Sequence, residues 1–286
     1  LKLIINELSN FVWILNGKVN MKRTWIYNAT IVNEGLKFAG SVVVEDDTIC
    51  EVLQGEVRPS VPCDAEIDAR GCYLIPGVID DHVHFRDPGL THKADMASET
   101  AAAAAGGVTS FMDMPNCNPQ TTTLEALENK FADAANKCIV NYSFYFGATN
   151  NNTELLQQLD KKHVCGVKLF MGASTGNMLV DRIESLRKIF SEAGMLIAAH
   201  CEDQTIIRWN TELVKSKYGE EDVDILFHPR IRSEEACWRS SSLAVQLAKE
   251  TGARLHILHV STARELELFE DKPISEKKIT SEACVS

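Results

Sequence analysis

The sequence has few of the features that mark secreted, membrane-spanning or nucleic-acid-binding proteins. Its nine cysteines form no CxxC pair and are odd in number, which favours a reduced, cytoplasmic protein over a disulfide-rich secreted one. Lys and Arg number only 29 against 40 Asp and Glu, a net charge of -11. This excess of negative charge argues against nucleic acid or an anionic membrane as partner. A local pocket can still oppose the global charge and bind a small anion.

Residues 1–20 lack a long hydrophobic run. Their longest apolar stretch is Phe11–Leu15, far too short to span a membrane. They also lack the charged start, apolar core and cleavage site of a secretory signal. We therefore expect 1–20 to be a non-native or upstream extension, with Met21 as the natural start. The chain ends at Ser286 just as a new strand begins, so we expect it to come from a longer protein, called here the full-length parent.

The pattern of apolar and polar residues changes near Pro76. Residues 21–75 are rich in β-branched residues and in short Asn, Gly and Asp-Asp turns, which predicts a small β-sandwich portion. In residues 76–286, apolar strands alternate with helices through six units and the start of a seventh. This alternation predicts a parallel sheet covered on both faces. We expect an α/β fold, a TIM-like (β/α)8 barrel truncated after about six units. A doubly wound sheet is the alternative, but no Gly-rich phosphate loop follows the first strand.

Two histidines lie on the first barrel strand, expected over residues 77–85. His82 and His84 are two residues apart, so both imidazoles should point to the same side, and Arg86 has the same parity. The carboxyl ends of barrel strands build the active site. Imidazole is a usual zinc ligand, so we favour a metal site over a pair of surface histidines.

Two further histidines end later strands. His200 closes the strand expected at 195–201, and His259 lies near the end of that at 253–260. Either alone would more often be a capping or core histidine, but their repeated placement at the carboxyl ends of strands favours metal ligation. His256 should face the opposite side to His259 and is interpreted as structural. The histidines left in loops or loop edges are His92, His163 and His228.

Lys168 lies inside the strand expected at 165–171. A buried lysine is costly unless neutralised or paired, so one reading is a bridge to a neighbouring carboxylate. The other is chemical. A desolvated lysine has a lowered pKa and is nucleophilic, and its reaction with carbon dioxide gives a carbamate whose two oxygens can bridge two cations.

These residues fall in an ordered set of recognisable segments. GVIDDHVHFRDPG, GGVTSFMDMPN, GVKLFMGAST, AAHCED and HILHVST together resemble the amidohydrolase superfamily and, within it, the dihydroorotases, a type similar to hydantoinases and allantoinases. The resemblance runs from about Met21 to Ser286. It implies a barrel flanked by a β-sandwich, and a cytoplasmic enzyme of pyrimidine biosynthesis that reversibly hydrolyses dihydroorotate to N-carbamoyl-aspartate.

The resemblance also implies roles for particular residues. Two zinc ions would share a hydroxide that attacks the ring amide. The implied metal ligands are His82, His84, carboxylated Lys168, His200 and His259. Arg86, Asn116 and the ligand His84 would contact the substrate. Arg86 favours dihydroorotase over hydantoinase and allantoinase, because a guanidinium matches a carboxylate bidentately.

Simpler interpretations of the substrate-binding residues stay open. Arg86 could form only a salt bridge with Asp87 within the loop. Asn116 could serve only to form a turn beside Pro115. The family's general acid–base, an aspartate at the end of strand 8, is absent from this chain. We therefore expect no catalytic acid–base here, and a 286-residue chain that is inactive or poorly soluble by itself. The expected partners are a small anionic substrate and, in a homodimer, a second copy of the chain. A non-catalytic scaffold remains the alternative of another class.

Overall fold

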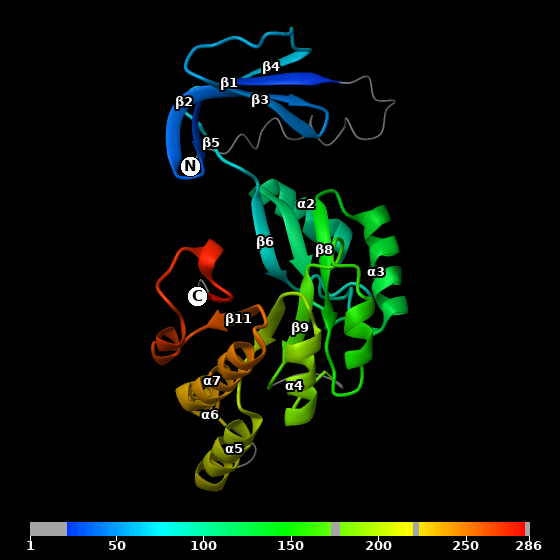
Figure 1. Cartoon of the computed structure of the whole chain (residues 1–286), viewed down its shortest axis with the longest axis vertical. Helices are drawn as coiled ribbons and strands as arrows, with labels where there is room; N and C mark the ends of the chain where they lie inside the picture. The colour runs from blue at the N-terminus through cyan, green and yellow to red at the C-terminus, as the bar shows by residue number, and fades with distance from the viewer. Residues whose placement is uncertain (1–21, 173–177, 220–222, 284–286) are drawn as a thin grey trace. The chain divides into compact units, whose positions relative to one another are not determined.

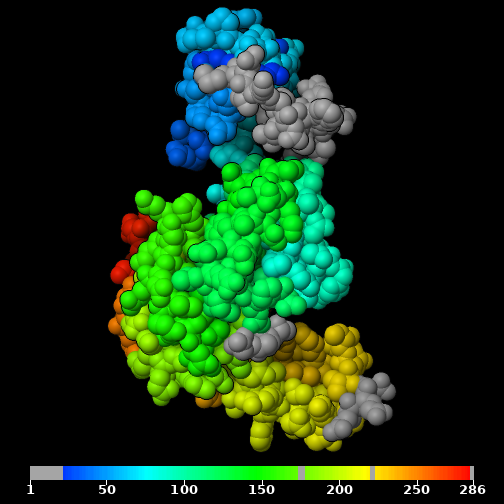
Figure 2. Space-filling model, turned by 90° about the vertical axis from the view of Figure 1, so that its right-hand side faces the viewer, coloured from blue at the N-terminus to red at the C-terminus, as the bar shows by residue number. Residues whose placement is uncertain are grey.

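The computed structural model describes residues 22–172, 178–219 and 223–283 (Figure 1 and Figure 2). They divide into two compact units. One holds the described residues up to Ile79 together with Ala102–Thr109, and the other holds Asp80–Ala101 and the described residues from Ser110 onward. The extension expected at 1–20 lies outside the described residues, and the domain boundaries expected at 21–75 and 76–286 stay predictions. None of the helices described is both long and apolar enough to cross a bilayer.

The first unit contains a mixed five-stranded sheet of order β3-β2-β1-β4, in which β5 also pairs with β1. Its strands are β1 Arg23–Asn33, β2 Leu36–Glu45, β3 Thr48–Gln54, β4 Ala65–Asp68 and β5 Tyr73–Leu74. β2 pairs antiparallel with both β1 and β3, whereas β4 and β5 pair parallel with β1. The turn between β1 and β2 has Glu34 and Gly35 at φ 49° and 77°, which matches the twist of a tight hairpin. The β-rich character read from the sequence is confirmed.

The second sheet has seven strands in chain order from β6 to β12. They are β6 Val78–Val83, β7 Val108–Asp113, β8 Asn141–Gly147, β9 Gly166–Phe170, β10 Ile197–His200, β11 Leu255–Val260 and β12 Ile279–Ala283. All the pairings from β7 through to β12 are parallel. Sequential parallel strands that neighbour one another are the arrangement of a barrel, not of a doubly wound sheet. The predicted partial barrel is therefore confirmed.

Six α-helices connect or flank the strands in the described residues. They are α2 Met96–Gly106, α3 Leu124–Lys137, α4 Ile183–Glu192, α5 Gln204–Tyr218, α6 His228–Ile231 and α7 Glu234–Thr251. The side chains of Thr123, Asp203 and Ser233 accept backbone N–H bonds at the starts of α3, α5 and α7, which satisfies donors that a helix start leaves unpaired. α7 ends where Gly252 adopts a left-handed conformation, as helix C-termini favour.

Alternation along the barrel strands sorts their side chains between two clusters. The larger core includes Val167 and Leu169 of β9 and Ile189 of α4, so these side chains pack on the helix side of the sheet. A smaller cluster on the other side of the strands includes Tyr145, Ala198 and Leu258. Lys168 shares the parity of this second side, because it lies between Val167 and Leu169. Lys168 therefore faces the interior of the partial barrel.

Candidate metal and substrate site

Four histidines gather at the carboxyl ends of barrel strands. The ring centroids of His82 and His84 lie 5.3 Å apart, those of His82 and His259 5.6 Å, and those of His200 and His259 4.8 Å. His200 Nδ1 lies 2.9 Å from His259 Nε2. Two imidazole nitrogens bound to one divalent cation at about 2.0–2.1 Å would be roughly 2.9–3.4 Å apart. This pair therefore has a spacing that suits a shared metal ion.

The protonation states of these histidines also suit ligation. Burial, together with the charges of Arg86 and His82, lowers the pKa of His84 to about 3. Burial and the neighbouring His200 lower the pKa of His259 to about 4. Both rings are therefore neutral near pH 7, and neutral imidazole is the form that binds metals.

Lys168 of β9 is almost completely buried, with 1% of its surface exposed. Its Nζ lies 4.7 Å from the ring centroid of Phe170. Burial lowers the pKa of Lys168 to about 7, although the negative charge of Glu282 opposes the shift. A lysine bridged closely to a carboxylate would keep a high pKa. With that pKa about half of the lysine is neutral at pH 7, and the neutral amine is the form that reacts as a nucleophile.

Each of three candidate ligands is held through one ring nitrogen by another side chain. His82 Nδ1 lies 2.5 Å from Glu282 of β12. His84 Nδ1 lies 2.7 Å from Asn116 Oδ1, and His200 Nε2 lies 2.8 Å from Glu202. Contacts of this kind fix the tautomer and orientation of a metal-binding histidine. The nitrogen left over in each ring is then the one that can meet a cation.

Glu202 is itself held by an arginine from a distant segment. Arg232, which follows α6, forms a two-pronged ion pair with it, with Nε at 2.7 Å from Oε1 and Nη2 on Oε2. Burial raises the pKa of Glu202, but the hydrogen bonds from Arg232 and His200 outweigh it and lower the pKa to about 2. No motif in the sequence indicated a role for Arg232. Its contact joins segments 30 residues apart, and no local spacing signals it.

Glu282 of β12 is a second site residue that no sequence motif indicated. Besides its contact with His82, it accepts a hydrogen bond of 3.0 Å from the backbone N–H of His259. Burial raises the pKa of Glu282, but hydrogen bonds from His256 and His82 outweigh it and lower the pKa. The only signal available was its alternation with Thr280 on the seventh strand, which places both on one face.

The expectation that His256 faces away from His259 is wrong. His256 Nε2 lies 3.5 Å from the Glu282 carboxylate, and the same carboxylate contacts His82, whose ring centroid lies 5.6 Å from that of His259. The pairing of β11 with β12 changes register after Ile257, and His259 has a φ of 39°. This irregularity breaks the period-two rule on which the expectation rested. His163, placed outside the site, is exposed and pairs with Asp160.

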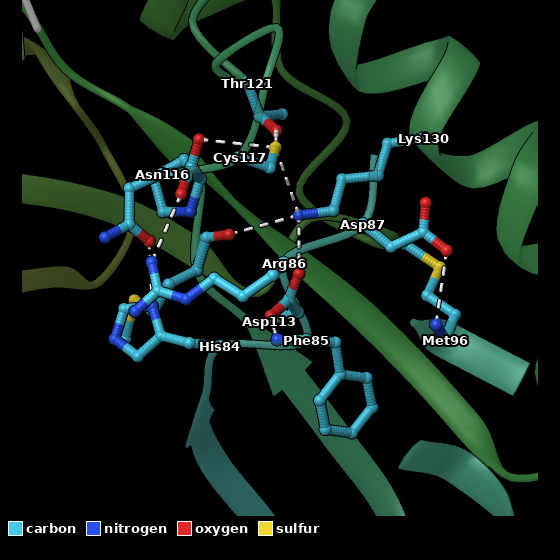
Figure 3. Close-up of polar contacts among 12 residues, drawn as sticks. His84, Phe85, Arg86, Asp87, Met96, Asp113, Asn116, Cys117, Thr121 and Lys130 are labelled. Carbon is cyan, nitrogen blue, oxygen red and sulfur yellow. Dashed lines mark hydrogen bonds and ion pairs between the residues drawn. The ribbon is translucent and has the colours of Figure 1, made fainter. Parts of the chain in front are cut away.

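Arg86 follows β6 instead of lying on it. Its φ is 63°, so its direction does not follow from strand parity. Figure 3 shows its guanidinium beside His84 and Asn116, and its Nη1 donates to the backbone oxygen of Asn116 at 3.4 Å. Asp87 pairs with Lys137 at 3.0 Å, so the loop ion pair between Arg86 and Asp87 is not what forms.

Comparison with known proteins identifies the family of the chain. The sequence model of the Dihydro-orotase-like family matches residues 71–265. The chain belongs to this family. It is 31% identical to a dihydroorotase of Methanosarcina mazei, over 92% of this chain and 56% of that protein. It is 32% identical to an allantoinase of Deinococcus radiodurans, over 79% of this chain and 51% of that protein.

Among solved structures, the chain resembles an L-hydantoinase (dihydropyrimidinase) from Arthrobacter aurescens, with a TM-score of 0.82 and 27% identity. The match covers 92% of this chain and 58% of that one. The chain spans about half the length of the curated relatives it matches. The family comprises metal-dependent cyclic amidohydrolases that typically use two zinc ions, and a small cyclic amide is the substrate class it implies.

Proposed function

We propose that the full-length parent of this chain is a dihydroorotase, which interconverts (S)-dihydroorotate and N-carbamoyl-L-aspartate. The observation that carries the proposal is the place of Arg86. Its guanidinium lies beside the candidate ligand His84 and against Asn116. Dihydroorotate carries a carboxylate next to its cyclic amide, and a guanidinium binds a carboxylate bidentately. A hydantoin or allantoin offers no carboxylate at that position.

The donor set fits a zinc centre. His82, His84, Lys168, His200 and His259 would hold the ions, with Lys168 as a carbamate. To form it, the neutral amine attacks the carbon of carbon dioxide, so that an N–C bond forms as one C=O π bond opens. The nitrogen then loses a proton, and a single negative charge is shared by the two carbamate oxygens. When bound, the two zinc ions would supply a hydroxide nucleophile at neutral pH and polarise the ring carbonyl.

The other residues of the site would bind and orient. Arg86 fixes the carboxylate, and therefore the ring, at one side of the site. Asn116 holds His84 in the tautomer that leaves Nε2 available, since Asn116 Oδ1 lies against Nδ1. Glu202 and Glu282 do the same for His200 and His82. Folding has already fixed the orientation of these side chains, so substrate binding does not have to supply the free energy that orders them.

The decisive test is Arg86→Met in the full-length parent, with dihydroorotate as substrate. Losing a charge-assisted pair of hydrogen bonds should raise KM about 10- to 100-fold, with a smaller change in kcat. Arg264→Met is the matched control, because Arg264 also pairs with a carboxylate, Glu235 at 2.7 Å, but is 41% exposed and outside the site. An unchanged KM in Arg86→Met would refute the substrate assignment.

The similar proteins include an allantoinase and an L-hydantoinase. The second candidate function is therefore hydrolysis of a cyclic amide that lacks this carboxylate. Comparing kcat/KM of the full-length parent for dihydroorotate, allantoin, a hydantoin and dihydrouracil separates the two. Preference for an uncharged ring would favour the second candidate. A non-catalytic scaffold predicts no bound zinc, whereas both enzyme proposals predict two zinc ions per chain by metal analysis.

A further inference from the structure

A buried ion pair lies directly behind the Arg86 segment. Asp113 at the end of β7 and Lys130 of α3 are each 1% exposed, and Lys130 Nζ lies 2.6 Å from Asp113 Oδ2. Lys130 also donates to the backbone oxygen of Met114 at 3.1 Å and lies 4.7 Å from the ring centroid of Phe144. Burying two charges is costly, and nothing in the proposed chemistry uses them directly.

The pair reaches the site through the backbone. Asp113 Oδ1 accepts a hydrogen bond of 2.8 Å from the N–H of Phe85, which is the residue before Arg86 (Figure 3). Lys130 occupies the other oxygen of the same carboxylate. The ammonium therefore fixes the carboxylate, and the carboxylate fixes the His84–Phe85 peptide, which is one peptide before the Phe85–Arg86 peptide.

A second ion pair holds the other side of Arg86. Asp87 is 2% exposed, accepts a hydrogen bond of 3.2 Å from the N–H of Met96 and pairs with Lys137 at 3.0 Å. Lys130 and Lys137 both belong to α3 and lie two helical turns apart, on one face. One helix thus supplies the counter-charges for both carboxylates that flank Arg86.

Arg86 needs such an anchor because its φ of 63° lies in the left-handed region, which a residue with a side chain rarely adopts. Backbone conformations of this kind persist when the surroundings hold them and are frequent at functional sites. A relaxed φ would turn the guanidinium away from Asn116 and His84.

We propose that Asp113 and Lys130 are positioning residues for Arg86, which set substrate affinity by holding its backbone in the left-handed conformation. The inference rests on the proposed function, in which Arg86 binds the substrate carboxylate. The ion pair of Lys137 with Asp87 holds the chain on the C-terminal side of Arg86. These two ion pairs would affect the binding of substrates that carry the carboxylate and not of rings that lack it.

Paired double variants separate positioning from simple loss of a buried ion pair. Asp113→Asn with Lys130→Met removes both charges but keeps an oxygen that accepts from the Phe85 N–H. Asp113→Leu with Lys130→Met removes both charges and the acceptor. In the full-length parent, the Leu-containing variant should raise KM for dihydroorotate about tenfold, while the Asn-containing variant stays within about threefold and kcat changes little in both. Turnover of dihydrouracil, which lacks the carboxylate, should not distinguish the two variants.

Hydrogen exchange of the Phe85 amide supplies a readout that does not depend on activity. It should be fastest in the Leu-containing variant, and Glu265→Gln serves as the control, since Glu265 is a buried carboxylate bound instead to Ser241 and Thr262. If wild-type protein does not hydrolyse dihydroorotate, the proposed function fails while exchange still tests the anchor. Equal KM values and equal Phe85 exchange in the two double variants would overturn the inference.

Discussion

The contact between Glu202 and His200 allows a sharp prediction. Because its pKa is about 2, Glu202 is fully ionised at neutral pH and can only accept hydrogen bonds. It therefore keeps the proton of His200 on Nε2, 2.8 Å away. This leaves His200 Nδ1 unprotonated, facing His259 Nε2. In Glu202→Gln, the amide NH2 can donate to Nε2 and drive the proton onto Nδ1, the nitrogen that would bind metal.

The magnitude follows from what the substitution removes. One charge-assisted contact to His200 disappears, and the two-pronged pairing with Arg232 weakens. Loss of a residue that supports a metal ligand typically weakens metal affinity about 10- to 100-fold, or about 1.4–2.7 kcal/mol. We expect zinc affinity to fall within that range while the fold persists, because the substitution conserves shape.

Zinc affinity is measured by competition with a chromophoric chelator at neutral pH, with circular dichroism as a check of folding. Glu235→Gln is the matched control, since Glu235 also pairs with an arginine, Arg264, but at an exposed position. Its zinc affinity should equal that of wild type. Wild-type affinity in Glu202→Gln would refute the idea that this carboxylate sets the tautomer of His200.

Two further predictions concern the body of the protein. Ile189 is fully buried in the main core, so Ile189→Ala should lower the free energy of unfolding by about 2–5 kcal/mol in a urea titration. The control Ile225→Ala, at a position 78% exposed, should change the free energy of unfolding by less than about 0.5 kcal/mol. Equal losses in the two variants would contradict the assignment of Ile189 to the core. Burial raises the pKa of Cys165 to about 12, so its thiolate fraction and its rate of alkylation should rise with pH throughout pH 7–10. Mass spectrometry should find the exposed Cys50 labelled long before Cys165 at pH 8, and rapid labelling of Cys165 would count against this environment.

Much of the fold could be predicted because its signals are local. Strand-like segments of β-branched and apolar residues alternate with helix-like ones, and this order alone predicts sequential parallel strands. The structure has those strands in that order. The type of the connecting helices was predicted less well than the strands. The segment after β11, where the regular strand–helix alternation predicts a helix, contains only the short 3-10 helix Arg264–Leu268.

Period-two reasoning worked at the candidate site only where strands are regular. His82 lies on β6, and its ring lies close to that of His84, as the spacing predicted. Arg86 lies beyond the strand with a φ of 63°, and His259 follows a register shift with a φ of 39°. Parity says nothing about such residues, and for this reason the orientation of His256 was predicted wrongly.

The sequence by itself determined the order of the strands, the residue types at their carboxyl ends and the position of a lysine inside a strand. Only the tertiary structure decided which side chains support them: Glu282 for His82, Arg232 through Glu202 for His200, and the Asp113–Lys130 pair behind Arg86. The physical reason is that a parallel sheet brings together strand ends from distant parts of the chain. Contacts made there depend on distance in space and leave no spacing to read along the sequence.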